Sequence, residues 1–417
     1  MPNPHPAARR IAPARDLTIP ESGSVTARGI LSGAITRLIS ELPTVGRGFA
    51  ISPEMRTDLA NFHALCRALA TKHPGALPSL LRRTPIATLV RALRHQPSEA
   101  LASELVGLVY FELARVGALE TPLRQHRPPQ RLVSLGGRVV VSMTEAPQSI
   151  ACANGKLTVK LSSDAVELRL GELADKPAGF AAHHGSVRVA KPYHDIEGDI
   201  VLALSDNNPL AMFEAHPDKQ GNAIELGGKT VDEWTTVLRD ALKLVETFLP
   251  DLRREMDLFV QQIVPVGYDE EKHLSASYQE AIGTIYMSLH PHLMTMTEAL
   301  IHEFSHNKIN ALFELDDVLE NAFSPLYTSP VRPDPRPLHG VLLAVHAFLP
   351  VARLYERMIE SGHPLSQNPA FLARFARIRQ INAEGADVVL GNGRPTEMGK
   401  PLLEEIRRWD GYYGRYG

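Results

Sequence analysis

A histidine pair inside a long helical stretch constrains this chain more than any other feature. His302, Glu303 and His306 form the pattern His-Glu-x-x-His, and residues 293–313 around it contain neither Gly nor Pro, so an uninterrupted helix is expected. Residues four apart on a helix are separated by about 400° around its axis, so both imidazoles project from one face. The two histidines can therefore bind one metal ion, and Glu303 can meet a water molecule bound to that ion. The alternative is two core histidines paired by a hydrogen bond.

The composition describes an ordinary globular chain and excludes several classes of function. With 417 residues, the chain can bury a large core and form two or three domains. A net charge of about −3 and the lack of a basic block argue against nucleic acid as a partner. No apolar run reaches about 18 residues, and residues 1–30 lack a continuous apolar segment, so neither a membrane span nor secretion is expected. The expected location is cytoplasmic.

Only two cysteines occur, Cys66 and Cys152, and neither lies in a Cys-x-x-Cys pattern. Two separate buried thiols are therefore expected in place of a disulfide framework.

Changes in periodicity divide the chain into four regions. Apolar residues recur every three or four positions before residue 128, and short β-branched runs separated by Gly-rich turns follow. The fold class expected is α+β, predominantly helical, with a small antiparallel sheet and a zincin-like motif helix. The predicted regions are a flexible N-terminal tail (1–23), a helical N-terminal region (24–128), a β-rich region (129–205) and a catalytic helical region with the motif (206–417).

Several local patterns sharpen this division. Asn154-Gly155 between two alternating runs is a hairpin signal, and Pro85 is expected to break a helix. The run 199–204 is expected to extend the antiparallel sheet. Residues 231–254 read as one amphipathic helix that packs internally or, less favoured, forms a homodimer surface. Further predictions are strands over 259–266 and 283–289 and a long helix over 338–361.

A metal site needs a third protein ligand, and the sequence offers several. The metzincin pattern requires Gly and His where this chain has Ile309 and Leu312, so that class is excluded. Carboxylates of the gluzincin type lie downstream, but each is better explained as part of the solvated helix end: Glu314, Asp316, Asp317 and Glu320.

The next long helix offers two histidines. His339 and His346 are about two turns apart on one face of an otherwise apolar stretch, where buried imidazoles need partners. His346 is the first candidate for the third metal ligand and His339 the second. His290 and His292, near a strand end, rank below both.

A proline-rich loop precedes that helix. Its prolines stiffen residues 329–337, which carry Arg332 and Arg336, and a guanidinium suits bidentate binding of a carboxylate. The loop is either an anion site beside the metal or a surface loop in which Arg332 pairs with Asp334.

With these residues in view, the chain resembles the HExxH-type peptide β-hydroxylases. These are iron- and 2-oxoglutarate-dependent enzymes that modify ribosomally made peptides. The resemblance rests on the motif, on residues 329–338, and on Gly340-Val-Leu and Ala347-Phe348. Residues 204–210 and 214–222 also fit the family pattern. The match covers roughly residues 200–360.

One departure concerns the third ligand. The family pattern has a histidine at the position of Leu343 and a tyrosine or similar residue at 346, whereas here the histidine stands at 346, one turn later.

The resemblance implies a function for each of these groups. His302, His306 and a third ligand would hold Fe(II), and Arg336, or else Arg332, would bind the far carboxylate of 2-oxoglutarate. Molecular oxygen and a ribosomal precursor peptide would be the other reactants, and a Cβ of that peptide would be hydroxylated. Glu303 would hold the metal ligands in position or, less favoured, would itself be a metal ligand. The segment around His216 would contact substrate or only form a turn at Pro217.

Two other functions stay open. In a zinc metallopeptidase of zincin type, Glu303 would be the general base, and imidazole suits zinc as well as iron. A peptide-binding pseudoenzyme is the third hypothesis, although the complete motif argues against it.

Overall fold

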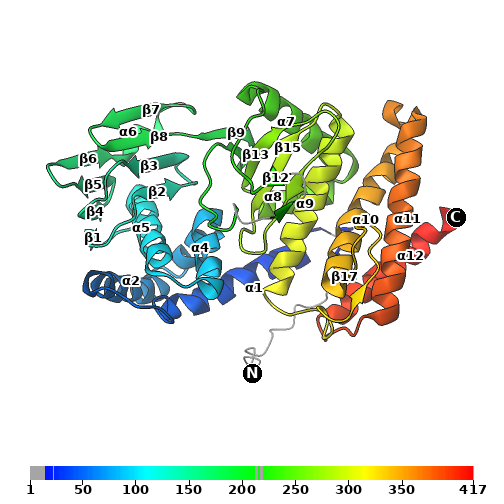
Figure 1. Cartoon of the computed structure of the whole chain (residues 1–417), viewed down its shortest axis with the longest axis horizontal. Coiled ribbons are helices and arrows are strands. Elements are labelled where there is room, and N and C mark those ends of the chain that lie inside the picture. Colours follow the sequence, from blue (N-terminus) through cyan, green and yellow to red (C-terminus); the bar gives the residue numbers. More distant parts are fainter. Residues whose placement is uncertain (1–14, 22, 212–214, 217–218, 417) are drawn as a thin grey trace.

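The computed structural model describes residues 15–21, 23–211, 215–216 and 219–416 (Figure 1). About half of the chain is helical, with small antiparallel and mixed sheets, so the α+β class is confirmed. In Figure 1 the second to fifth helices and the antiparallel strands occupy one half of the molecule, the last four long helices occupy the other, and the first helix runs across the middle.

The N-terminal region is helical. Ser52 and Ser98 cap the second and fifth helices by accepting hydrogen bonds from Met55 N and Leu101 N. The expected break falls just before Pro85, which lies in the first turn of a new helix, where proline is favoured. The helices are α1 (Val25–Glu41), α2 (Pro53–Lys72), α3 (Ala76–Arg82), α4 (Thr84–His95) and α5 (Glu99–Val116).

Two antiparallel sheets follow within the described residues. One has the order β1-β4-β5-β6 and the other β2-β3-β8-β7. The Asn154-Gly155 turn joins β4 to β5 as expected, and Gly155 takes the φ of 73° that such a turn requires. The elements are β1 (Leu123–Gln125), β2 (Arg131–Ser134), β3 (Val139–Met143), β4 (Ser149–Ala153), β5 (Lys156–Lys160), β6 (Ala165–Arg169), α6 (Leu170–Ala174), β7 (Ala181–His184) and β8 (Val187–Ala190).

A mixed sheet of order β14-β15-β13-β10-β9 lies beside the motif helix. The run expected to extend the antiparallel sheet instead forms β10 (Ile200–Ala203), which pairs in parallel with β13 (Gln262–Tyr268). All four β10 residues are buried, as in parallel strands covered on both faces. The remaining strands of this sheet are β9 (Tyr193–Glu197), β14 (Ser275–Ala276) and β15 (Thr284–Leu289).

The C-terminal helices complete the molecule. The amphipathic segment expected as one helix is broken at Leu249: α7 (Val231–Phe248) ends there, and α8 (Pro250–Phe259) starts with proline in its first turn. The buried face of α7 packs internally, against the core of this half. The other helices are α9 (Leu293–Phe313), α10 (Leu338–Glu360), α11 (Pro369–Asn392) and α12 (Gly399–Tyr413). Short elements are β11 (Ala215–His216), β12 (Lys219–Gln220), β16 (Leu326–Tyr327), β17 (Arg336–Pro337) and the 3-10 turns Leu42–Thr44, Pro364–Gln367 and Gly414–Tyr416.

The mixed sheet separates two hydrophobic cores. Ile263 and Ile285 belong to the core formed with α7 to α12, whereas Val264 and Tyr286 belong to the core of the N-terminal helices and antiparallel sheets. This alternation follows from the period of two along a strand. Both cysteines are free and buried, as expected.

The segment before α1 is partly packed. Residues 1–14 and 22 of the expected flexible tail lie outside the described residues, but Leu17, Thr18 and Ile19 are buried. Glu405 of α12 accepts hydrogen bonds from Leu17 N (2.8 Å) and Thr18 N (2.9 Å). Lys308 of α9 donates to Asp16 O at 2.7 Å. Residues 16–19 therefore form a docked segment, in contrast to the expectation of a loose tail.

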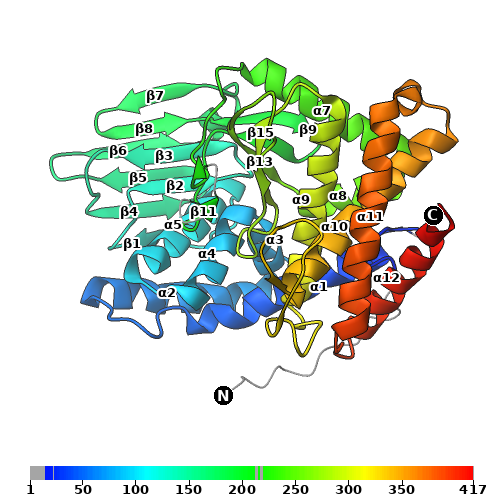
Figure 2. The same cartoon turned by 45° about the vertical axis from the view of Figure 1, so that its right-hand side comes forward.

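By length and composition α10 could cross a membrane, but 72% of its most apolar window is buried within the protein. It is one of the core helices of this half (Figure 2).

Candidate metal centre

Helix α9 brings His302 and His306 together. The helix runs from Leu293 to Phe313 without interruption, over the range expected from its lack of Gly and Pro. The two Nε2 atoms lie 2.9 Å apart, and the ring planes are perpendicular. At this distance one imidazole donates a hydrogen bond to the other. A metal ion that replaced the shared proton would be bound by both nitrogens.

The surroundings keep both imidazoles neutral. Burial lowers the pKa of His306 to about 4. Burial also holds the pKa of His302 well below its ordinary value, with His306, Arg374 and His346 adding to the effect. A neutral imidazole is the form that binds a metal ion, so no proton must leave these rings at neutral pH.

Glu303 completes a group of three. It is 3% exposed, and its Oε1 accepts a hydrogen bond from Ser275 Oγ of β14 at 2.7 Å. Ser277 Oγ donates to the Glu303 main-chain oxygen at 3.2 Å. The edge strand of the mixed sheet thus holds the glutamate from one side.

The donor atoms of His302, Glu303 and His306 all lie within 4.8 Å of one another. Among the described residues this is the one such group of histidine, cysteine and carboxylate side chains. Two neutral nitrogens and a carboxylate are donors that suit zinc or iron. The residues therefore fit a divalent transition metal, with a further position to be filled from outside the motif.

His346, the first candidate for the third ligand, is not part of this group. It is 1% exposed, and its Nε2 donates to the main-chain oxygen of Leu17 at 2.9 Å. Burial, with Lys308 nearby, lowers the pKa of His346 to about 3. Its Nδ1 has no hydrogen-bond partner among the described residues. The ring therefore secures the docked segment through one nitrogen and keeps a lone pair on the other.

His339 lies between aromatic rings. Its ring centroid is 4.6 Å from that of Phe313 and 5.1 Å from that of Phe323. Leu343, where the family pattern has histidine, is a partly buried apolar residue against the core. Neither residue contributes a donor atom to the group on α9.

The arginine loop forms a small hairpin at the start of α10. Arg336 lies in β17, which pairs with β16, and its Nε is 2.8 Å from the Asp334 carboxylate. The pairing of Arg332 with Asp334 that the sequence suggested is thus made by Arg336 instead. The Arg336 side chain is 40% exposed.

Sequence reasoning missed an ion pair that lies beside His302. Glu298 lies one turn before His302 on the same face of α9, and Arg374 of α11 binds it at 2.6 Å. Arg374 is also the cation that lowers the pKa of His302. Glu298, His302 and His306 follow one another at intervals of four, so the sequence could have shown that they share one face of α9. Arg374 could not be found in this way, because it comes from a distant helix.

Two other expectations concern Glu314 and the 214–222 segment. Glu314, expected at a solvated helix end, is 2% exposed and is bound by Arg91 and Arg94 at 3.0 and 2.7 Å. It links α9 to α4 and is not placed at the motif. The 214–222 segment lies partly outside the described residues, and so does the side chain of His216.

A comparison with protein-family models gave no match to this chain, and neither did one with curated proteins.

Proposed function

We propose that this chain is an Fe(II)- and 2-oxoglutarate-dependent enzyme that hydroxylates a Cβ of a residue in a ribosomally synthesised peptide. The proposal combines the family resemblance of residues 200–360 with the donor group on α9. The observation that carries it is the pair of half-buried, neutral imidazoles with their Nε2 atoms 2.9 Å apart. A cytoplasmic location, where such precursor peptides are made, is part of the proposal.

In this proposal His302 and His306 hold the metal. The third position is assigned to His346 through Nδ1, the ring atom that its bond with Leu17 leaves unused. Because His346 is not part of the donor group in the structure, its ring must move toward α9 when the metal binds. Glu303, which already lies in the donor group, is the alternative third ligand. When bound, iron with 2-oxoglutarate supplies an oxidant for an unactivated C–H bond.

The 2-oxoglutarate site is assigned to Arg336 first and Arg332 second. Because Asp334 holds Arg336 in the structure, the co-substrate must replace that carboxylate, and the exposed position of the pair makes this exchange inexpensive. The hydrogen bond from Ser275 to Glu303 supports a positioning role for Glu303, since it fixes a carboxylate beside the two imidazoles.

A zinc metallopeptidase is the second candidate. It is favoured by the closeness of the Glu303 carboxylate to both Nε2 atoms, because a general base must reach a water bound to the metal.

Anaerobic reconstitution separates the two functions. The metal-free chain is loaded with Fe(II) or Zn(II) and given a candidate precursor peptide, 2-oxoglutarate and oxygen. Peptide-dependent succinate formation and a mass increase of one oxygen are expected with iron. Cleavage of the peptide with zinc and no succinate would overturn the hydroxylase proposal in favour of the peptidase. Failure to bind either metal would leave only the pseudoenzyme.

Substitution of Glu303 gives an independent test. Glu303→Gln keeps the size and the hydrogen bond with Ser275 but removes the base. Partial hydroxylation, within about a hundredfold of the native rate, is expected because changes beside a metal ligand cost about 10–100-fold. Near-total loss of turnover with full retention of metal would instead indicate a general base. Ser275→Ala, which frees the carboxylate, is the matched control.

A further inference from the structure

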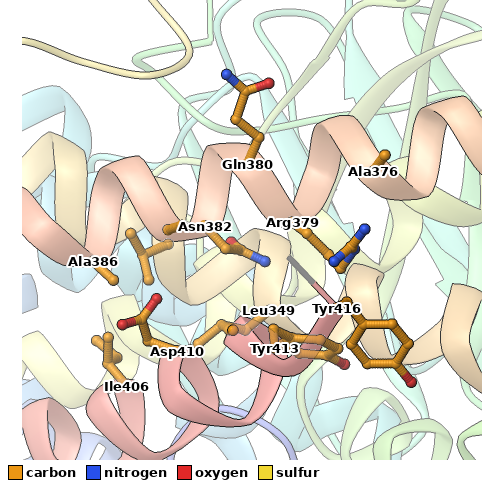
Figure 3. Close-up of a pocket in the computed structure, with 13 residues that line it drawn as sticks. Leu349, Ala376, Arg379, Gln380, Asn382, Ala386, Ile406, Asp410, Tyr413 and Tyr416 are labelled. Atoms are coloured by element: carbon orange, nitrogen blue, oxygen red, sulfur yellow. The ribbon is translucent and has the colours of Figure 1, made fainter.

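A cavity of about 290 Å³ lies between α10, α11 and α12 (Figure 3), and none of the α9 donor residues lines it. Its walls are mainly apolar and come from Val345 and Leu349 of α10, Ala383 and Ala386 of α11, and Ile406 of α12. The volume is at the lower end of ligand pockets, so it suits a small ligand with an apolar body.

Arg379 supplies a positive charge at one end. Its guanidinium carbon lies 5.1 Å from the centre of the Phe375 ring and 5.0 Å from that of Tyr416. Its Nε is buried and has no hydrogen-bond partner among the described residues. Aromatic rings orient a guanidinium without neutralising it, so the group remains available to an anion.

Asn382 supplies an acceptor in the middle. The residue is 3% exposed, and its Nδ2 donates to the main-chain oxygen of Phe348 at 3.1 Å. That bond fixes the amide, and its Oδ1 then has no hydrogen-bond donor among the described residues. A buried acceptor left without a donor is costly, which points to a ligand N–H or ordered water at this position.

Asp410 supplies a negative charge at the other end. Figure 3 shows its carboxylate beside Ala386 and Ile406, with Arg379 and Tyr416 at the opposite end and Asn382 between them. Burial and the nearby Asp387 raise the pKa of Asp410. A cationic group of a ligand beside Asp410 would stabilise its carboxylate against both burial and the charge of Asp387.

The spacing of these groups sets the length of the ligand. The Asp410 carboxylate lies beside Ala386, which is seven residues from Arg379 on α11, so the backbone positions that mark the two ends are about 10 Å apart along the helix axis. A free amino acid is too short to bridge this distance. An extended peptide spans about 3.3–3.6 Å per residue, so about three residues are needed.

We propose that this cavity binds a short zwitterionic peptide of about three residues with small apolar side chains. Its terminal carboxylate pairs with Arg379, a backbone N–H donates to Asn382 Oδ1, and its terminal ammonium pairs with Asp410. The site goes beyond the hydroxylase proposal and does not depend on it, because it uses none of the metal-binding or 2-oxoglutarate-binding residues. Phe348 lies between the two sites: its main-chain oxygen accepts from Asn382, and its ring centre is 4.8 Å from that of His302.

Calorimetric titration of the full, metal-free chain with the peptide Ala-Leu-Ala tests the proposal. Saturable one-to-one binding is expected, and the N-acetylated peptide and the C-terminal amide should each bind at least tenfold more weakly. Equal binding of the blocked and free peptides, or no saturable binding of any of them, would overturn it.

Variants assign the two ends. Arg379→Gln should remove the preference for a free carboxylate, and Asp410→Asn the preference for a free ammonium group. Ala383→Phe, at an exposed lining position, should fill the cavity and abolish binding without altering charge. Arg407→Gln on the exposed face of α12 removes a cation outside the lining and should bind as the native chain does. If it loses as much affinity as Arg379→Gln, the effect is one of general charge and the assignment fails.

Discussion

The histidines of α9 and those of α10 show how differently two adjacent helices use the same side chain. On α9, the Nε2 atoms of His302 and His306 face each other at hydrogen-bond distance, 2.9 Å apart. On α10, His339 lies between two aromatic rings, and His346 donates to Leu17 of the docked segment. All four are partly or fully buried, and burial lowers the pKa of each.

The difference comes from the range of the interactions. A spacing of four residues makes two side chains meet through the helix itself, whatever packs around it. A spacing of seven places His339 and His346 on one face but about 10 Å apart, so the environment of each depends on whichever segment packs there. The α9 pair is therefore suited to a shared ligand, whereas each α10 histidine has separate partners.

The largest effect is expected from the α9 pair. His302→Ala or His306→Ala should weaken binding of Co(II) or Zn(II) by at least about 100-fold, because a ligand contributes more than the 10–100-fold of an outer-shell partner. Metal content after dialysis and titration with Co(II) measure it. His339→Ala is the matched control and should retain the metal; a comparable loss there would erase the contrast between the helices.

Acid should destabilise the metal-free protein through these buried rings. The pKa of His346 is about 3 when folded and returns to about 6.5 on unfolding, so the unfolded chain binds more protons between these values. The free energy of unfolding should therefore be constant above about pH 7 and fall as the pH decreases below about 6.5. His306 acts in the same direction, with a folded pKa of about 4.

Urea unfolding of the native chain and of His346→Gln at pH 7.5, 6.0 and 5.0 checks this pH dependence. Glutamine keeps an N–H donor but does not titrate, so the variant should lose less stability on acidification, by up to about 1.4 kcal/mol per pH unit. Identical slopes for the two proteins would contradict the assignment to His346.

His346→Ala should lower the free energy of unfolding by about 1–3 kcal/mol at pH 7.5, because the buried oxygen of Leu17 loses its donor. His339→Ala should cost less, about 0.5–1.5 kcal/mol, since it removes ring contacts only.

Metal content decides the remaining role of His346. Loss of metal from His346→Ala is expected if its Nδ1 is the third ligand, and full retention would assign that position to Glu303.

The smallest effect on stability is expected at the exposed arginine loop. Asp334→Ala should change the free energy of unfolding by less than about 1 kcal/mol, because it removes an ion pair with an exposed arginine. Arg336→Gln should be equally mild in stability but should weaken 2-oxoglutarate binding about tenfold. Arg332→Gln should weaken it less, and the opposite order would reverse the assignment.

Local patterns predicted much of the fold. The bounds of α9, the hairpin at Asn154-Gly155 and the break before Pro85 each follow from a few neighbouring residues. The break at Leu249 was missed because Pro250, at the start of a helix, leaves the apolar period almost intact. The run 200–203 was assigned to the wrong sheet because pairing partners far along the chain do not affect a local pattern.

The same limit applies to the candidate site. The convergence of His302 with His306 could be predicted, since both lie on one helix. Three other pairings could not be predicted, because the partners lie on distant segments. His346 binds Leu17, Arg374 binds Glu298, and Glu314 binds Arg91 and Arg94.

The docked segment also sets an order of events during synthesis. Leu17 and Glu405 are separated by 388 positions, so residues 16–19 cannot complete their contacts until α12 has left the ribosome. At 5–20 residues per second, this delay is on the order of 20–80 s. The paired charges of Lys308 and Glu255 and the ring of His346 are made late in that interval, and from then until α12 follows they lie under a segment that is not yet held by Glu405. We expect the nascent chain to need protection from aggregation until its last helix is made, and a ribosome-bound chain ending before α12 to be readily cleaved by protease near residue 17.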